Sequence, residues 1–253
     1  MSMRRRMKGA GLRRGLRSGG SSSFVFPAST LLIYDGIHTY ARTVSSSPDV
    51  DALINLRKPG TWNISQSTAS KKPHETLSNP VNINFDNSTS NILLNNTGGT
   101  LIPAESEVCL WAVVDISAMV SATTGSILHT APTATPAHTS FTYRGFAQFF
   151  DSQFVTKNNG TVIASVSYAP TGYNVLRSRL TKEYVSAAID GVETKTASAG
   201  NGGNITAYNA VSLGASITDS SYMDGLFRYA VVCLNPTDQD VLKVDNFLAS
   251  LLP

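Results

Sequence analysis

The sequence predicts an all-β fold in which two antiparallel sheets pack into a sandwich and one α-helix closes the chain. Three observations support this fold class. About a dozen short runs rich in β-branched and aromatic residues follow one another at near-regular spacing. Turn-forming residues such as Asp190-Gly191 separate these runs. Only residues 238–251 place apolar side chains at helical spacing.

The clearest strand pattern is a hairpin that turns at Asp190-Gly191. Before the turn every second residue is apolar, namely Val185, Ala187 and Ile189. This is the period of a strand with one buried face. The Asp-Gly pair tolerates positive φ and suits a two-residue turn, after which a second strand begins. We expect this hairpin to lie at the centre of the sandwich.

The most apolar run of the chain, residues 107–116, predicts a central strand that is covered on both faces. Residues 51–56 fit either a strand or a single helical turn. The remaining strands are expected within residues 24–40 and at 81–85, 91–94, 126–129, 143–150, 161–168, 174–180, 210–213 and 226–234.

Residues 238–251 form the one expected α-helix. Thr237 is a natural N-cap residue, and Asp240 stands three residues later, as in a capping box. The apolar residues that then recur at helical spacing are Val241, Val244, Leu248 and Leu251. The helix should therefore pack its apolar face on the sandwich.

Charge divides the chain into two parts. With 253 residues, 42% of them hydrophobic, residues 24–253 can form a single β-sandwich domain. Residues 1–23 contain no acidic residue and seven basic ones: Arg4, Arg5, Arg6, Lys8, Arg13, Arg14 and Arg17. The remainder has 13 basic and 17 acidic residues, so its net charge is about −4. We expect residues 1–23 to form an extended arm that holds a partner protein or nucleic acid, with a solvated tail as the alternative.

Cys109 and Cys233 both lie in apolar runs of strand character. We expect buried free thiols in neighbouring strands, with a disulfide as the alternative. No run reaches the ~18 apolar residues of a membrane span. The N-terminal arginines are not followed by the apolar segment of a signal peptide. We therefore expect no membrane partner.

Four short motifs occur in a fixed order along the chain: residues 83–87 (INFDN), 189–193 (IDGVE), 211–215 (VSLGA) and 223–232 (MDGLFRYAVV). Together they resemble the concanavalin A-like lectin/laminin-G-type jelly-roll family, although Asn87 stands where that family usually has glycine. The resemblance implies a jelly-roll sandwich with a role in binding or assembly. It carries over none of the family's carbohydrate or calcium sites. The opening of the chain is also similar to the N-termini of tailed-phage structural proteins that carry such domains.

The sequence has no motif typical of catalysis. Glycoside hydrolases of the resembled superfamily cluster carboxylates as E-x-D-x-x-E or E-x-D-x-E on one strand. Here serine separates Glu105 from Glu107, and Asp115 lies eight residues beyond Glu107. The histidines are scattered, without an H-E-x-x-H or G-x-S-x-G motif. We expect no enzyme activity and no cofactor.

Two sets of residues are candidates for ligand binding. Aspartates in turns can supply oxygen ligands for calcium, although such residues more often only shape the turn: Asp86, Asp190, Asp219 and Asp224. Aromatic side chains can form a sugar platform, although they more often pack in a core: Tyr143, Phe146, Phe149, Phe150 and Phe154.

The arm, the resemblance and the missing catalytic motifs favour a structural protein of a tailed-phage virion, as a capsid-decoration, minor capsid or tail component. Its partners would be other virion proteins and copies of itself, in a trimer or a larger ring. The alternative is a carbohydrate-binding adhesion module that recognises cell-surface glycans. Nucleic-acid binding through the arm is disfavoured because the body is acidic.

Overall fold

The computed structural model describes residues 24–76, 78, 80–95, 99–103, 106–119, 125–131, 144–150, 153–158, 161–167, 171–197, 208–215 and 221–253. The basic arm predicted at residues 1–23 lies outside this part of the chain. The strands are β1 (Thr30–Asp35), β2 (Arg42–Ser46), β3 (Asp49–Leu53), β4 (Ile64–Ser65), β5 (His74–Glu75), β6 (Ile83–Phe85), β7 (Leu93–Asn95), β8 (Val108–Asp115), β9 (Gly125–Ala131), β10 (Arg144–Phe150), β11 (Gln153–Asn158), β12 (Thr161–Ser167), β13 (Tyr173–Leu180), β14 (Tyr184–Ile189), β15 (Val192–Ala197), β16 (Ala210–Leu213) and β17 (Gly225–Leu234). Three short 3₁₀ turns and α1 (Asp238–Ala249) complete the fold.

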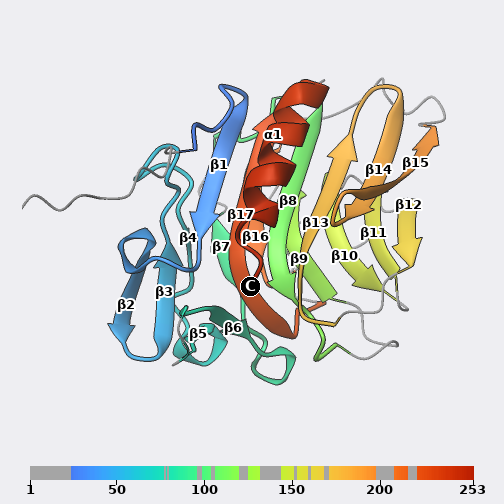
Figure 1. The fold of residues 1–253 in the computed structure, drawn as a ribbon. Coiled ribbons are helices and arrows are strands. Elements are labelled where there is room, and N and C mark those ends of the chain that lie inside the picture. The colour runs from blue at the N-terminus through green and yellow to red at the C-terminus, as the bar shows by residue number, and fades with distance from the viewer. Residues whose placement is uncertain are drawn as a thin grey trace, which may run out of the picture.

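Two antiparallel layers form the sandwich (Figure 1). The first sheet has the strand order β1-β17-β8-β13-β14-β15. The second has the order β2-β3-β4-β7-β16-β9-β10-β11-β12. Strands β5 and β6 join β3 to β17, so the hydrogen bonding continues from one sheet to the other. The predicted all-β sandwich with one C-terminal helix is confirmed.

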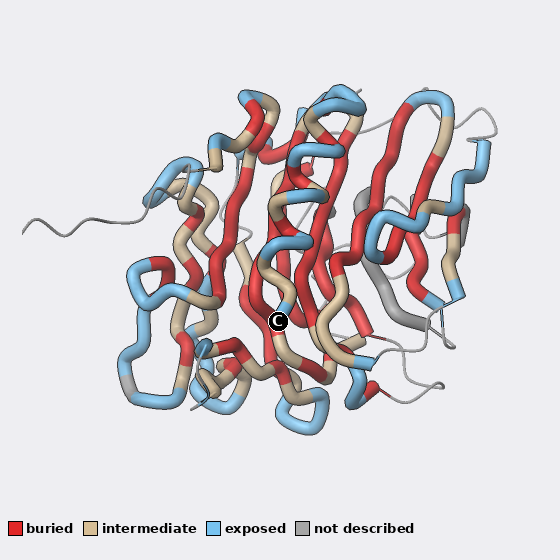
Figure 2. The backbone as a smooth tube through the Cα atoms, in the orientation of Figure 1, coloured by how far each residue is buried: buried red, intermediate tan, exposed pale blue. Residues whose placement is uncertain are grey.

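Two hydrophobic cores lie on opposite faces of the first sheet. Leu110 and Ala112 of β8 face the inner core between the sheets, whereas Cys109, Trp111 and Val113 face an outer core beneath α1. Figure 2 shows the buried tubes running along this part of the sheet behind the helix. Because both faces of β8 are covered, the strand needs an uninterrupted apolar sequence. The prediction of a central, doubly buried strand is therefore confirmed.

The C-terminal helix α1 lies across the outer face of the first sheet (Figure 1). Thr237 caps it by accepting a hydrogen bond of 3.1 Å from the backbone N–H of Asp240, whose carboxylate in turn accepts one of 3.2 Å from the N–H of Thr237. Its buried residues are Val241, Val244 and Leu248. The helix and its capping box thus form as predicted, ending at Ala249 rather than 251.

The hairpin at Asp190-Gly191 forms as predicted, with φ of 47° and 82° at the two turn residues. Its expected central position is wrong. Strand β15 lies at the end of the first sheet's strand order and is mostly exposed, while β8 and β17 occupy the middle. The alternating pattern reports one buried face, and a strand near the edge of a sheet has one as readily as a central strand.

The cysteines lie as expected, in neighbouring strands. Cys109 and Cys233 are direct partners in the register of β8 and β17, and both are buried free thiols. For residues 51–56 the sequence left two alternatives; residues 51–53 belong to the strand β3, and the strand ends at Leu53. No helix within the described residues has the length and apolar character needed to cross a membrane.

The first described residues are attached to the helix through aromatic contacts. The ring of Phe24 stacks on that of Phe247 with 4.3 Å between the centroids. The ring of Phe26 meets Phe247 edge-on at 5.1 Å and stacks on Tyr229 at 6.4 Å. The chain therefore enters the sandwich from a fixed point beside α1.

Candidate functional site

A groove runs along α1, between the helix and the hairpin of β14 and β15, over strand β13. It consists of three hollows of about 240, 190 and 230 Å³. The first two share Arg179 and Asp238, and the last two share Leu242 and Asp245, so the hollows adjoin one another along the helix. We call this surface the α1 groove; it is lined by Glu107, Val175, Arg177, Arg179, Thr181, Glu183, Tyr184, Asp190, Gly191, Glu193, Lys195, Asp238, Val241, Leu242, Asp245, Asn246, Ala249 and Leu252.

Strand register brings the charged side chains of the groove together. Arg177 on β13 is opposite Ala188 on β14, which is opposite Glu193 on β15. One step along, Arg179 is opposite Ser186, which is opposite Lys195. Residues two apart point to the same face of a strand, so both rows lie on the outer face. The small side chains of β14 leave space between the arginines and the edge strand.

Arg177 ties the hairpin to the helix. Its side chain is only 8% exposed and forms ion pairs with Glu193, at 3.0 Å, and with Asp245. Asp245 also accepts a hydrogen bond of 2.7 Å from the indole N–H of Trp111. One guanidinium group on β13 therefore fixes the position of the edge strand β15 relative to the helix α1.

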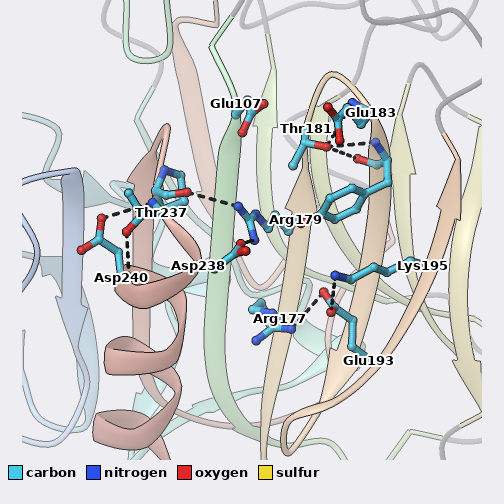
Figure 3. Close-up of polar contacts among 12 residues, drawn as sticks. Glu107, Arg177, Arg179, Thr181, Glu183, Glu193, Lys195, Thr237, Asp238 and Asp240 are labelled. Carbon is cyan, nitrogen blue, oxygen red and sulfur yellow. Dashed lines mark hydrogen bonds and ion pairs between the residues drawn. The ribbon is translucent and has the colours of Figure 1, made fainter.

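Arg179 and Lys195, which Figure 3 labels, both lie beside the ring of Tyr184 according to the distances to its centroid. The Arg179 guanidinium carbon is 5.6 Å and the Lys195 ammonium 4.6 Å from the ring centroid. Arg179 also donates to Asp238 at 2.6 Å, and Lys195 pairs with Glu193 at 3.2 Å. Tyr184 lines the end hollow, Lys195 the middle one and Arg179 both, so an aromatic ring and two cations lie where these two hollows adjoin.

The carboxylates on either side of Arg177 differ in their protonation equilibria. Burial raises the pKa of Asp245 above its usual value, although Arg177 and Trp111 oppose that shift. Burial would also raise the pKa of Glu193, but Ser186, Arg177 and Lys195 together hold it below its usual value. Arg179 lowers the pKa of Asp238 through their hydrogen bond.

Comparisons with known proteins identify the fold and no family. No family model and no curated protein sequence matches the chain. A structure of botulinum neurotoxin type C, whose cell entry depends on interaction with two ganglioside molecules, is similar at a TM-score of 0.58 and 10% identity, over 87% of this chain and 51% of that one. An arabinofuranosidase complexed with arabinofuranosyl-α-1,2-xylobiose is similar at 0.56 and 13%, over 79% of this chain and 50% of that one.

The sialidase of Trypanosoma rangeli is also similar, with a TM-score of 0.55 and 10% identity over 87% of this chain and 33% of the enzyme. The chain therefore spans about half, or a third, of the length of the structures that it matches. At such low identity the likeness shows the β-sandwich fold, and it assigns no activity.

Three of the four turn aspartates lie within the described residues. Asp86 accepts hydrogen bonds of 2.7 Å from the backbone and hydroxyl of Ser88, and Asp190 accepts one of 2.8 Å from the backbone of Val175. Burial, with a contribution from Asp86, raises the pKa of Asp224. Asp219 lies outside the described residues. Within the described ranges no three His, Cys, Asp or Glu side chains are grouped to hold a metal ion.

The predicted sugar platform falls mainly on residues whose side chains are not described. Tyr143 lies outside the described residues, and β10 contains Phe146, Phe149 and Phe150. Phe154 is fully buried in the inner core and so cannot contact a sugar. Of the paired glutamates, Glu105 lies outside the described residues and Glu107 lines one end of the α1 groove.

Sequence reasoning did not identify the groove. Its one sequence signal is the pair of arginines two residues apart in the otherwise apolar β13 sequence, VLRSRL. Arg177 and Arg179 must share one face, and buried arginines need acidic partners. Those partners lie 16 to 68 residues later in the sequence, from Glu193 to Asp245, both of which pair with Arg177, so no local pattern connects them.

Proposed function

We propose that this chain is a carbohydrate-binding β-sandwich that holds a saccharide in the α1 groove. The observation that carries this proposal is the middle hollow of the groove, which is lined by Arg177, Arg179, Glu193 and Lys195 and adjoins the hollow lined by Tyr184. Planar, fixed polar groups can hydrogen-bond to sugar hydroxyls, and an aromatic ring can pack on a sugar face. Such a concave surface with a few convergent polar groups is typical of ligand sites.

The structural neighbours support this choice of ligand class. One is a toxin that interacts with ganglioside molecules, and another is complexed with an arabinofuranosyl-xylobiose saccharide. These proteins share a sandwich fold with this chain and differ from one another in activity. The fold alone is therefore compatible with glycan binding with or without hydrolysis.

We propose binding without hydrolysis. A glycosidase needs two carboxyl groups, one of which is free to give a proton to the leaving group. Two carboxylates that line the middle hollow, those of Glu193 and Asp245, both pair with Arg177. Asp245 is further held by Trp111, so its two oxygens already accept hydrogen bonds. Neither group is placed as an unengaged general acid.

An immobilised glycan panel, read with and without calcium, tests the proposal. We expect selective binding by the full chain, and at least a tenfold loss of affinity in Lys195→Ala. Thr194→Ala, on the opposite face of the same edge strand, is the matched control and should bind as the parent does. A panel without any bound glycan, for a chain that is folded by circular dichroism, would contradict the proposal.

A tailed-phage virion role is the second proposal, and the two are compatible. It is supported by the seven cations of residues 1–23, by the acidic body, and by the aromatic attachment of Phe24 and Phe26 to α1. If residues 1–23 bind a neighbouring virion protein, or another copy in a trimer or ring, this attachment would hold the sandwich close to that partner. Removing residues 1–23 should abolish incorporation into particles, and normal incorporation of the truncated chain would reject this role.

A further inference from the structure

We propose that the α1 groove selects an acidic saccharide, whose carboxylate or sulfate group binds between Arg179 and Lys195 while the sugar ring packs on Tyr184. This inference rests on the proposed function and adds the chemical class of the ligand. Its basis is the set of hydrogen bonds and ion pairs that Arg179 and Lys195 form within the described residues.

Arg179 is a buried cation with an exposed partner. Its side chain is 10% exposed, whereas that of Asp238, which accepts its hydrogen bond, is 90% exposed. A second guanidinium N–H donates to the backbone carbonyl of Pro236 at 3.2 Å. The Nε atom is buried and has no hydrogen-bond partner within the described part of the chain. Because Asp238 is exposed, its carboxylate is hydrated again when it leaves Arg179, and a ligand anion that takes its place keeps the buried guanidinium paired.

Lys195 supplies the second charge. Its side chain is 53% exposed, so its ammonium can move toward a ligand without leaving a buried site. In the present structure that ammonium lies over the same ring that Arg179 flanks. An anion bound next to this ring can therefore accept hydrogen bonds from the buried guanidinium of Arg179 and from the half-exposed ammonium of Lys195.

The acids of the groove define where such an anion binds. Glu193 is occupied by Arg177 and Lys195, and Asp245 by Arg177 and Trp111. Glu107 and Glu183 line the end hollow together with Arg179 and Tyr184, whereas Lys195 lines the middle hollow. The acidic group is thus expected in the middle hollow, with neutral sugar units extending toward the apolar end formed by Leu242 and Leu252.

The test compares acidic oligosaccharides with their neutral parents on the full chain. The probes are 3′-sialyllactose against lactose, a glucuronic-acid-substituted xylo-oligosaccharide against the unsubstituted one, and a sulfated against an unsulfated galactoside. In 20 mM salt we expect at least one acidic member to bind ten times more tightly than its parent. That preference should shrink as salt rises to about 0.5 M. The three pairs separate a carboxylate ligand from a sulfate.

Variants assign the preference to the two cations. Lys195→Gln and Arg179→Gln should each remove most of the acidic preference, and Lys195→Gln, being half-exposed, should leave folding unchanged. Asp238→Asn should raise affinity for the acidic probe about threefold, because it removes the competing carboxylate. Asp49→Asn, at a half-buried acid on β3 of the second sheet, is the control and should leave the acidic preference unchanged.

The outcomes distinguish this inference from the proposed function. Equal binding of acidic and neutral probes, or an unchanged preference in Lys195→Gln, would overturn the inference and leave carbohydrate binding in place. A chain that binds no saccharide at all would overturn both.

Discussion

The indole N–H of Trp111 donates a 2.7 Å hydrogen bond to the carboxylate of Asp245 and so joins the central strand β8 to the helix α1. The same carboxylate pairs with Arg177. One acidic side chain therefore satisfies a buried indole and a buried guanidinium in the outer core.

Replacing Asp245 with alanine should lower the free energy of unfolding by about 3 kcal/mol, because it leaves the Arg177 charge and the Trp111 donor without this partner. Urea denaturation followed by fluorescence measures the change. Lys243→Ala, an exposed residue of the same helix, is the control and should shift stability by less than about 0.5 kcal/mol. A loss in Asp245→Ala no larger than that of the control would contradict this role.

The capping box gives a second prediction. Thr237→Ala removes the acceptor for the Asp240 N–H and should cost about 1 kcal/mol of stability. Thr237→Ser keeps the hydroxyl and should retain most of it. Equal stability of the two variants would show that the cap contributes nothing.

Acid sensitivity should depend on Glu193. Its pKa in the folded chain is below the ordinary value of 4.5, so the stability that it contributes is present above pH 4.5 and is lost as pH falls through the folded value. Glu193→Gln should therefore flatten the decline of stability below pH 4.5. Asp245→Asn should do the opposite, since the pKa of Asp245 is raised by burial and its protonation favours the folded chain. Parallel pH curves for both variants and the parent would refute the assignment.

Gly214 should tolerate no side chain. Its φ is +85°, and an added Cβ would lie 2.1 Å from the ring of Phe85. We expect Gly214→Ala to cost about 3 kcal/mol or more, from backbone strain together with displacement of a core aromatic. Gly172, at φ +114° with open space around it, is the matched control, and its alanine variant should show only the strain, about 1 kcal/mol. Similar losses at the two positions would remove the steric explanation.

The sequence predicts well those elements whose pattern is local. The apolar run of β8, the alternation of β14 and the capped helix α1 each follow from residues that are close in the chain. No local pattern predicts that Cys109 and Cys233 are direct partners in the register of β8 and β17. The apolar character of both runs nevertheless predicted that the two cysteines lie in neighbouring strands. Strong local signals therefore identified the layers of the sandwich.

The α1 groove depends on contacts between distant segments, and this is why the sequence did not reveal it. Whether Arg177 is a surface residue or a buried link depends on Glu193 and Asp245 arriving from another strand and from the helix. The position of β14 and β15 at the edge is likewise set by which strands pair, because alternation is the same at the edge and in the middle. The order in which strands pair depends on contacts between segments that are far apart in the sequence, such as β8 with β13 and β17.

The neighbours of β8 have a consequence for how the chain is synthesised. One edge of β8 pairs with β13 and the other with β17, more than a hundred residues later, while its outer face lies in the core that α1 covers together with Phe26 and Leu56. A nascent chain that ends before residue 225 lacks β17 and α1. One edge of its most apolar strand, β8, then has no strand to pair with, and the outer face of that strand is exposed to solvent. We expect ribosome-bound fragments of that length to recruit chaperones, and the sandwich to close only once β17 and α1 have emerged from the ribosome.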